Sequence, residues 1–591
     1  MTSPALFDET DDTGLPLTPR EDVPRASGLA ATLEENLCAL LERAEHEPGG
    51  AAEELVRRVL LADRGDHVVI GGPNPPLYRS QGRLRRFVVH EKELEELLGD
   101  VRDGDDVFLF GISLGEEVAY LLRTRPDAKL VVWDRDPWLV RLALTRQDYR
   151  KALSTGRLRI AMGADIVDHL PTLHERRVVF HPTFRTIYKD EMTLVSEAIS
   201  GTAPNDGRRW VALGMGGTPV RYIASALRQE GFSVMPLELQ RWHPDEVGIA
   251  IEKLRPERVV TVNYSATVAT SCGALDIPLY VWEVDPTTDR MPSPPEDSES
   301  SSIQMFTLRE DHVADLEKAG FENVSYLPLG VDVETRSPSR TSAPGEPDYA
   351  SPVTFVGSSL VGRAERFRRL FLQLYASFDC CGDESFEETE QRLDEVLRAE
   401  RADYSRYVTN ELLEERFGEF LEAARRSGTP DDPRKWVAEI VASQKRVAYV
   451  SALAEERVQI WGDEGWSSVA ATHPSVVYRG KADSGSELTR IYAGADVNVD
   501  VNRIYQPDVI TARVFDVLAC GGFMIAEYSN SLAEEFRIGE EIVAYRTLAE
   551  LEDMVQHYRK ARDEAEAIAA RGLEAVRKRH TMRSRVRRLF G

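Results

Sequence analysis

Short apolar runs alternate with amphipathic segments over most of this chain, and no other feature of the sequence constrains the fold as much. Each apolar run has the length of one buried strand, and each amphipathic segment has the length and spacing of one helix. A strand can join a parallel neighbour only through a crossover, which is usually a helix. The alternation therefore predicts parallel α/β domains.

The alternation falls into three stretches, each of which predicts one Rossmann-like sheet. The strands expected in the first stretch are residues 67–71, 106–110, 129–133, 158–162 and 177–180. The strands expected in the second are residues 209–213, 232–236, 258–262 and 279–284. The strands expected in the third are residues 352–356, 457–461, 476–478, 497–501 and 522–526. We therefore expect an α/β protein with three Rossmann-like domains.

Shifts in composition set the expected domain boundaries. A charged, Pro/Thr-rich beginning predicts a disordered tail, and a Pro/Ser-rich linker divides the last two domains at residues 335–350. The expected order is a tail at 1–27, N-terminal helices and an accessory domain at 28–203, a second domain at 204–335, a third at 350–545 with a helical insertion at 364–453, and terminal helices at 546–591. The Glu/Arg-rich insertion predicts a mostly solvated surface and is a candidate for homodimerisation.

Charge and hydropathy exclude several classes of protein. The 591 residues carry a net charge of −26, which argues against a general nucleic-acid binder and against docking on an anionic membrane except through a local basic patch. The run 571–591, with eight cations and one acid, is the candidate patch for peripheral contact. No apolar stretch is long enough to span a bilayer, and no signal pattern is present. The five scattered cysteines suggest neither a disulfide framework nor a zinc site, so we expect a cytoplasmic protein.

The third domain opens with an apolar strand that runs into the Gly/Ser turn of Gly357 and Ser358. Such a turn lets backbone N–H groups approach a phosphate closely, although a plain strand followed by a turn has the same pattern. Arg479 and Lys481 follow a later strand and can neutralise a diphosphate, with Arg363 as a further candidate. The alternative for these cations is a solvated surface.

The most specific run in the sequence is residues 506–527. A loop ends at Asp508 and a helix is expected to begin near Ile510, so the N–H groups of its first turn suit an anionic diphosphate. The candidates for that contact are Val509, Ile510, Thr511 and Arg513. Asp516 lies eight residues after Asp508, about two helical turns on, so both carboxylates are expected to face one cleft.

Residues 350–591 resemble the C-terminal domain of the CgeB-like (spore-maturation-protein-like) glycosyltransferases of the two-domain GT-B class. The matching segments are 491–496, 511–523 and 580–586. Asp508 and Asp516 resemble the paired acids of retaining GT-B enzymes, in which both are usually Glu, so each side chain here is one methylene shorter. The resemblance implies that Asp516 binds ribose, that Asp508 binds the sugar, and that the terminal helix packs back across both halves.

The second domain would then be the acceptor half of the pair. Residues 280–286 resemble a strand end in the N-terminal halves of CgeB-like proteins, although here Pro286 follows Asp285 directly. Asp285 is expected at the carboxyl edge of a strand, where it would act in the cleft, and a simple Asp-Pro turn is the alternative. The Gly-rich turn at 211–218 fits an acceptor-side loop better than a nicotinamide site.

The accessory domain has a glycine turn at Gly111 and Gly115 and an acidic strand end at Asp134 and Asp136. This arrangement can bind adenosyl or nucleotide ligands, so an S-adenosylmethionine-dependent methyltransferase is an alternative. Asp134-x-Asp136 can also be the metal-binding D-x-D of a GT-A enzyme. The stretch resembles the N-terminal region of the motility accessory factor (Maf) flagellin glycosyltransferases. Two glutamates directly after Gly115 would repel a phosphate, which favours a scaffold or an acceptor-recognition module.

These patterns together predict a glycosyltransferase that uses a nucleotide-sugar as its donor substrate. The resemblance implies a protein acceptor (flagellin-like or surface protein) or a glycan acceptor, and retention of configuration. We expect neither a metal nor a cofactor, because fixed cations and helix N–H groups can stabilise the charge that grows on the leaving diphosphate. The alternatives are the methyltransferase and a non-catalytic binding module on a degenerate transferase fold.

Overall fold

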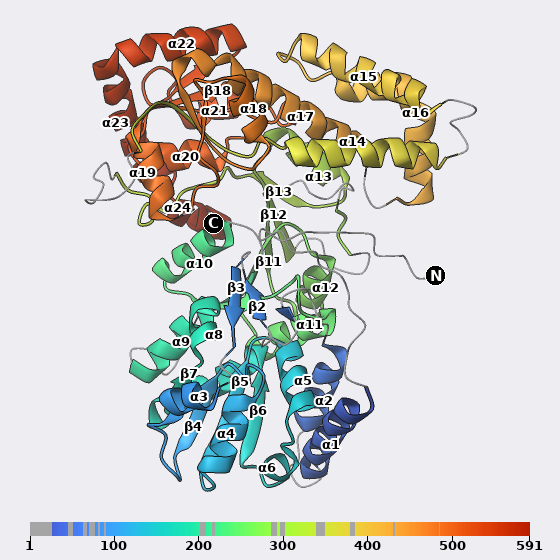
Figure 1. Cartoon of the computed structure of the whole chain (residues 1–591), viewed down its shortest axis with the longest axis vertical. Coiled ribbons are helices and arrows are strands. Elements are labelled where there is room, and N and C mark those ends of the chain that lie inside the picture. Colours follow the sequence, from blue (N-terminus) through green and yellow to red (C-terminus); the bar gives the residue numbers. More distant parts are fainter. Residues whose placement is uncertain are drawn as a thin grey trace. The chain divides into compact units, whose positions relative to one another are not determined.

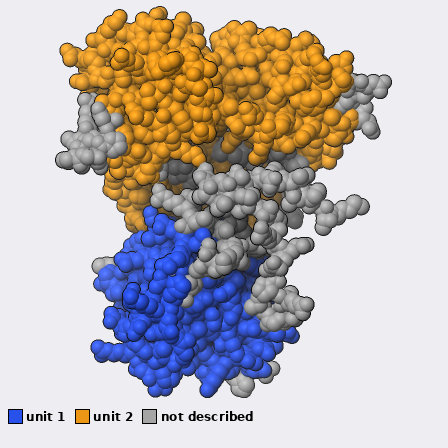
Figure 2. All heavy atoms as spheres, in the orientation of Figure 1, with its two compact units in different colours: residues 1–207, 239–253 blue, residues 208–238, 254–591 orange. Residues whose placement is uncertain are grey.

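The computed structural model divides into two compact units, residues 1–207 with 239–253 and residues 208–238 with 254–591 (Figure 2). The residues that it describes are 26–44, 51–62, 68–69, 77–80, 83–87, 90–200, 209–215, 219–284, 292–295, 302–338, 349–378, 385–429, 432–483 and 485–591. Most of the predicted tail and most of the Pro/Ser-rich linker lie outside these residues. None of the helices in the described parts is both long and apolar enough to cross a bilayer.

The first unit is built on a parallel sheet with the strand order β6-β5-β4-β7. Its strands are β4 (Asp106–Phe110), β5 (Lys129–Asp134), β6 (Leu158–Met162) and β7 (Arg177–Phe180), and a small antiparallel sheet is formed by β1 (Val68–Val69), β2 (Leu77–Ser80) and β3 (Arg83–Arg86). Its helices are α1 (Ala26–Ala44), α2 (Ala51–Leu61), α3 (Glu91–Leu98), α4 (Glu116–Thr124), α5 (Pro137–Arg146), α6 (Arg150–Ser154), α7 (Ile166–His169), α8 (Pro182–Ile187), α9 (Lys189–Ser200) and most of α11 (Pro244–Leu254). The central strands are buried on both faces, which explains their continuous apolar sequences.

The second unit contains two parallel six-stranded sheets. Its first half has the order β13-β12-β11-β10-β8-β9. The strands are β8 (Trp210–Gly214), β9 (Ser233–Leu237), β10 (Arg258–Val262), β11 (Leu279–Glu283), β12 (Ile303–Thr307) and β13 (Asn323–Tyr326), and the helices of this half are α10 (Pro219–Gln229), α12 (Ala266–Leu275) and α13 (Val313–Lys318). All of its strand pairs are parallel.

The second half has the order β16-β15-β14-β17-β18-β19, in which the direction of strand addition reverses between β14 and β17. Its strands are β14 (Ser351–Val356), β15 (Val458–Trp461), β16 (Val477–Tyr478), β17 (Ala495–Val499), β18 (Met524–Glu527) and β19 (Val543–Tyr545). Its helices are α14 (Val361–Ala376), α15 (Phe386–Ala402), α16 (Thr409–Ser427), α17 (Pro433–Ala452), α18 (Trp466–Thr472), α19 (Ser486–Gly494), α20 (Ala512–Ala519), α21 (Asn530–Glu535), α22 (Leu548–Lys560), α23 (Arg562–Arg579) and α24 (Met582–Phe590). The prediction of an α/β fold with Rossmann-like parallel sheets is confirmed.

The terminal helix α24 returns to the first half, as the resemblance implied. It contacts α10, and Arg583 and Arg587 both pair with Glu230 at the end of that helix. One hydrophobic cluster holds residues of α10, α20 and α24 together. The two halves of this unit therefore share a core.

The helical insertion is less solvated than its composition predicts. Helices α14, α15, α16 and α17 form one group (Figure 1), and α14 packs along α17. Helix α17 is buried over most of its length, including the charged residues Glu439, Lys445 and Arg446. The prediction of a mostly solvated surface is therefore wrong for α17, because this helix packs on α14, α15 and α16, and its Tyr449 and Val450 join the core beside the sheet.

Candidate donor site

The loops that follow β14 and β17 form the candidate site, because ligands of open α/β sheets bind outside the carboxyl ends of the strands where the strand order reverses. Strand β14 leads through the turn 357–360 into α14, and β17 leads through the loop 500–511 into α20. Helix α17 also borders these two loops. Its Arg446 donates hydrogen bonds to the carbonyl oxygens of Ser358, at 2.9 Å, and Val501, at 3.3 Å, and so contacts both loops.

The donors of the turn after β14 are bound to the chain itself. The N–H groups of Ser359 and Leu360 donate to the Asp463 carboxylate at 2.9 and 3.3 Å, and the Ser358 hydroxyl donates to the same carboxylate. These hydrogen bonds lower the pKa of Asp463, although burial works in the opposite direction. Asp463 thus occupies the Ser358 hydroxyl and the two N–H groups that follow it in the expected phosphate turn, and the Gly357 N–H donates to the carbonyl oxygen of Trp461 at 2.8 Å.

Arg513 lies between the two loops. Its guanidinium pairs with Asp500, directly after β17, and donates to the carbonyl oxygen of Val356 at the end of β14. Gly357 provides the room, since a Cβ there would lie 2.5 Å from Nη2 of Arg513. The Thr511 hydroxyl donates to the other carboxylate oxygen of Asp500 at 3.0 Å. Arg513 therefore joins the two loops, and Asp500 offsets its charge.

Two further arginines, which the sequence motifs do not include, lie beside Arg513. Burial lowers the pKa of Arg446 to about 10, and the positive charges of Arg513 and Arg503 lower it further, whereas Asp500 raises it. Arg503 follows β17 by four residues, and its side chain is 26 % exposed. Arg503 and Arg513 therefore lie close enough to Arg446 for their positive charges to act on its pKa.

Glu439 of α17 links the remaining side chains. Its Oε1 accepts a hydrogen bond from the Tyr505 hydroxyl at 2.7 Å and lies 3.6 Å from Arg363 and 3.7 Å from Arg503. The Glu439 side chain is 5 % exposed, and none of the described residues forms a hydrogen bond with its Oε2. The predicted residue Arg363 therefore belongs to the same group of charges, although it is half exposed at the start of α14.

We call Arg363, Arg446, Arg503 and Arg513 the arginine cluster. Two carboxylates, Asp500 and Glu439, lie against these four guanidinium groups, so the balance is positive. Lys445, which lies beside Arg446 in α17, is neutralised by Glu527 at 2.5 Å. The excess comes from the exposed Arg363 and the partly exposed Arg503, and an excess of positive charge at the carboxyl edge of a parallel sheet is suited to a polyanion such as a diphosphate.

A sequence signal for Arg446 was present. Glu439, Lys445 and Arg446 interrupt an otherwise apolar helical run, and charged residues in such a run are rarely buried unless they have partners. Arg503 has a weaker signal, which is its position just after a buried strand.

The structure does not bring Arg479 and Lys481 to the arginine cluster. Both follow the edge strand β16, two strands away from β14, and both are exposed. The Arg479 side chain donates to Gln459 at 3.3 Å. The predicted diphosphate contacts of these two cations therefore have no support from the strand order.

Asp508 and Asp516 lie in different surroundings. Helix α20 begins at Ala512, two residues after the predicted start near Ile510, so Asp508 lies in a turn before the helix and Asp516 lies on it. Asp508 pairs with Arg309 of the first half at 3.3 Å, and Asp516 lies 3.4 Å from Arg336. Burial raises the pKa of Asp516, and Arg336 opposes that shift.

The N-terminus of α20 faces the same loop. Thr511 is the N-cap residue, and the first N–H groups of a helix have no partner within that helix. Of the predicted contacts, the Val509 N–H is bonded to the carbonyl oxygen of Gln506 at 3.3 Å, and Ile510 is buried. The N-terminus of α20 therefore adds partial positive charge to the loop that carries Arg503 and Arg513.

In the first unit, the protein's own side chains fill the predicted nucleotide turn. A Cβ on Gly111 would lie 2.4 Å from the Phe184 ring, and one on Gly115 would lie 2.3 Å from the Tyr149 hydroxyl. Both glycines have positive φ, of 97° and 87°, so the turn requires them for its backbone as well. These contacts explain Gly111 and Gly115 without a ligand.

The acidic strand end of the first unit is also internally satisfied. Asp134 is fully buried and accepts hydrogen bonds from Ile112 N–H at 2.8 Å, Asp136 N–H at 2.9 Å and the Tyr188 hydroxyl at 2.8 Å. Asp136 is the N-cap of α5 and accepts from Trp138 N–H at 3.0 Å. An acid that binds ribose must be open to a ligand, whereas both carboxylate oxygens of Asp134 accept hydrogen bonds from the protein itself.

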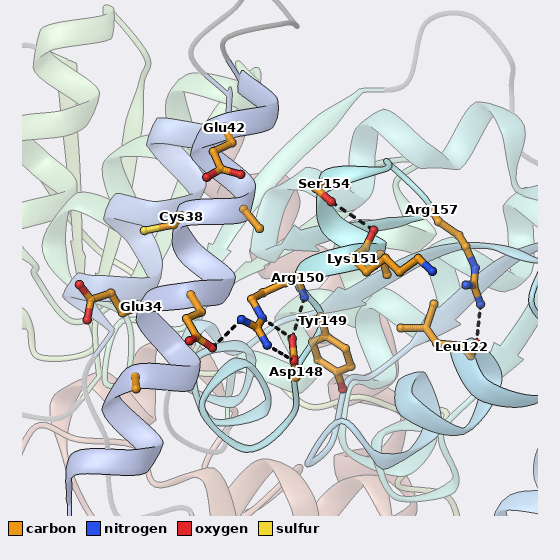
Figure 3. A pocket seen from close by; sticks show the side chains of 14 residues that line it. Glu34, Cys38, Glu42, Leu122, Asp148, Tyr149, Arg150, Lys151, Ser154 and Arg157 are labelled. Atoms are coloured by element: carbon orange, nitrogen blue, oxygen red, sulfur yellow. Dashed lines mark hydrogen bonds and ion pairs between the residues drawn. The ribbon is translucent and has the colours of Figure 1, made fainter.

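A hollow of about 1020 Å³ lies elsewhere in the first unit, between α1 and α6 (Figure 3). Some of its charged side chains are held by the protein itself. Arg150 pairs with Asp148 at 2.6 Å and with Glu35 at 3.2 Å, and Arg157 donates to the carbonyl oxygen of Leu122 at 2.7 Å. None of the predicted site residues lines this hollow.

Asp285, the predicted acceptor-side acid, lies outside the described residues, as does part of the Gly-rich turn at 216–218. The strand before Asp285, β11, ends at Glu283. Glu283 accepts a hydrogen bond from Tyr264 N–H at 2.6 Å.

Residues 435–591 match a family model described as glycosyl transferase-like. The match begins in α17 and ends with α24, so it includes Arg446, Arg503, Arg513 and both predicted acids. No curated protein matches the chain. This part of the chain is thus glycosyl transferase-like in sequence.

Solved structures with a similar arrangement are distant in sequence. A glycosyltransferase from Rickettsia africae is 9% identical with a TM-score of 0.42, and the match covers 65% of this chain and 97% of that one. Anabaena Alr3699/HepE, solved with UDP and glucose, is 10% identical with a TM-score of 0.37 over 65% of this chain and 98% of its own. A MAf glycosyltransferase from Magnetospirillum magneticum is 12% identical with a TM-score of 0.21 over 50% and 56%. None of these likenesses carries a functional argument by itself.

Proposed function

We propose that this protein is a GT-B glycosyltransferase that moves a sugar from a nucleotide-sugar to a protein or glycan acceptor. The observation that carries the proposal is the arginine cluster, which lies at the strand-order reversal of the second half and mostly inside the glycosyl transferase-like segment. A CgeB-like specificity and a flagellin-like or surface-protein acceptor are finer parts of the same proposal.

The chemistry follows from the charges around the loops. When the bond between the anomeric carbon and the diphosphate oxygen breaks, the electron pair stays on the oxygen and negative charge grows on the diphosphate. Arg446, Arg503 and Arg513 and the N-terminus of α20 would stabilise that charge. The acceptor hydroxyl forms the new bond to the anomeric carbon, and its proton passes to the departing diphosphate, which carries the electron pair of the broken bond.

The predicted acids take their roles within this scheme. Asp516, held near Arg336, would accept hydrogen bonds from the ribose hydroxyls. Asp508 would accept hydrogen bonds from the sugar, and Asp285 would act on the acceptor side. We further propose that the enzyme retains configuration and needs neither a metal nor a cofactor. Its basic C-terminal helices would make peripheral contact with a membrane. The protein would form a homodimer and be cytoplasmic.

Nucleotide binding by the purified chain tests the proposal. We expect UDP, GDP or dTDP, or one of their hexose conjugates, to raise the melting temperature, and Arg503→Ala to weaken the binding of the same nucleotide at least about tenfold, because one charge-assisted contact is lost. Arg416→Ala, which removes an exposed arginine of α16, is the matched control and should leave the affinity unchanged. Stabilisation by S-adenosylmethionine alone, or equal affinities of Arg503→Ala and wild type, would contradict the proposal.

A further inference from the structure

Arg309 of the first half of the second unit contacts Asp508, the predicted sugar acid. Arg309 follows β12 by two residues, so it lies at the carboxyl edge of its sheet. Its Nε lies 3.3 Å from Oδ1 of Asp508, which belongs to the loop before α20 in the other half. The two residues are 199 positions apart in the chain. This contact therefore depends on how the two halves meet.

The ion pair uses only one oxygen of the acid. The Asp508 side chain is 10 % exposed, and its Oδ2 is buried without a hydrogen-bond partner in the described part of the chain. In the same loop, Oδ1 of Asn502 and Nε2 of Gln506 are also buried and lack partners among the described residues. Buried polar atoms are nearly always satisfied in folded proteins. Oδ2 is therefore the acceptor of this carboxylate that the described residues leave without a donor, and a sugar hydroxyl is a donor that would suit it.

A second contact supports the approach of the same segment. Glu310, which follows Arg309, accepts a hydrogen bond from the Ser531 hydroxyl of α21 at 3.4 Å. His312, in the same short turn, has its pKa lowered by burial and by Arg309, while Asp508 opposes the shift. The turn after β12 is thus held against the second half of the unit, and Arg309 is the residue beside this turn that contacts Asp508.

We propose that Arg309 is a positioning residue for the donor sugar: it fixes Oδ1 of Asp508 and thereby presents Oδ2 to a sugar hydroxyl. The inference rests on the proposed function. Asp is one methylene shorter than the usual Glu, so its carboxylate reaches less far from the backbone. Arg309, from the first half, orients this carboxylate, so the sugar contact depends on residues of both halves.

Turnover and diphosphate binding separate this role from a structural one. The assay is release of the nucleoside diphosphate from UDP-, GDP- and dTDP-hexoses, together with the dissociation constant for each free diphosphate. We expect Arg309→Ala to lower turnover by about 10- to 100-fold, because a misplaced contact to the reacting sugar costs about that much. The dissociation constant of the free diphosphate should stay within about twofold. Arg309→Lys, which keeps the charge, should recover part of the loss.

The Asp508→Ala background tests the coupling. If Arg309 acts through Asp508, adding Arg309→Ala to Asp508→Ala should cause little further loss. Arg583→Ala is the matched control, because Arg583 also joins the halves, through Glu230, but far along the chain from the acids. It should leave turnover unchanged in both backgrounds. Full additivity, or unchanged turnover of Arg309→Ala, would overturn the inference.

The outcomes also separate this inference from the proposed function. A wild-type chain that binds none of the diphosphates and turns over none of the donors would overturn both. Diphosphate binding that Arg503→Ala weakens, combined with a silent Arg309→Ala, would overturn only the role of Arg309. Loss of diphosphate affinity in Arg309→Ala, equal to its loss of turnover, would assign Arg309 to the diphosphate site and overturn the sugar role.

Discussion

Asp134 is a buried carboxylate for which the sequence and the structure indicate different roles. From the sequence, an acid at a strand end after a glycine turn suggests ribose binding. In the structure the same acid receives hydrogen bonds from Ile112, Asp136 and Tyr188 and is fully buried. Burial raises the pKa of Asp134 to about 7, against the three hydrogen bonds, which lower it. The carboxylate is therefore a structural group whose protonation is linked to folding.

This linkage predicts a pH dependence of stability. In the unfolded chain Asp134 loses its proton near pH 4, whereas in the folded chain it keeps the proton up to about pH 7. Because the folded state binds the extra proton, the stability of the wild type should fall, relative to Asp134→Asn, as the pH rises from about 4 to about 7. Melting temperatures of both proteins across this range provide the measurement. Glu95→Gln, an exposed change in the same unit, should follow the wild type, and parallel profiles for Asp134→Asn would refute the linkage.

Among the elements, the turn between β14 and α14 depends on a neighbouring strand. Leu360 has a positive φ of 63°, and the N–H groups of Ser359 and Leu360 point at the carboxylate of Asp463, which follows β15. Ser359 and Leu360 are both buried, so water cannot easily replace the acceptor. Asp463 therefore holds the start of α14, and with it the position of Ser358 beside Arg446.

Removal of this carboxylate should destabilise the protein. We expect Asp463→Ala to reduce the free energy of unfolding by about 2 kcal/mol, because buried donors that lose their acceptor cost about 1–3 kcal/mol. Denaturant unfolding measures the change, with Asp483→Ala, an exposed aspartate of the same half, as a control that should stay within about 0.5 kcal/mol of wild type. Tighter binding of nucleoside diphosphates to Asp463→Ala, without loss of stability, would instead favour the turn as a phosphate cradle.

At the scale of the second unit, one hydrophobic cluster connects the two sheets. It contains Ile223 and Leu227 of α10 from the first half, Phe515 of α20 from the second half, and Val586 and Leu589 of α24. A shared core means that neither half can lose its packing without exposing apolar surface of the other. The second unit should therefore unfold as one cooperative body.

A change in α24 tests this cooperativity. Val586 is fully buried, so Val586→Ala should lower the free energy of unfolding by about 1–3 kcal/mol through lost burial and the cavity left behind. The calorimetric transition of the second unit should move as a whole to lower temperature. Arg588→Ala, an exposed change in the same helix, should leave the transition in place. Two separate transitions, with only one shifted, would show that the halves fold independently.

The sequence by itself determined the parallel sheets, most of their strands and the helical C-terminus, because strand and helix periodicity are local properties. It also indicated the loop before α20 and placed the start of that helix within two residues, because Asp508, Arg513 and the helix start lie close together in the chain. Strand β19 was not predicted, because a strand of three residues leaves little pattern.

Only the tertiary structure decided which charges meet. Arg446 and Arg503 join Arg513, Asp463 occupies the turn that was expected to bind phosphate, and side chains of the first unit fill its nucleotide turn. Asp508 likewise obtains its partner from the other half. Apart from Arg503 and Arg513, which lie on the same loop, these contacts join segments that are far apart in the chain, so no spacing in the sequence encodes them. The order of the strands brings the loops together, and charge balance and burial then determine which side chains remain for a ligand.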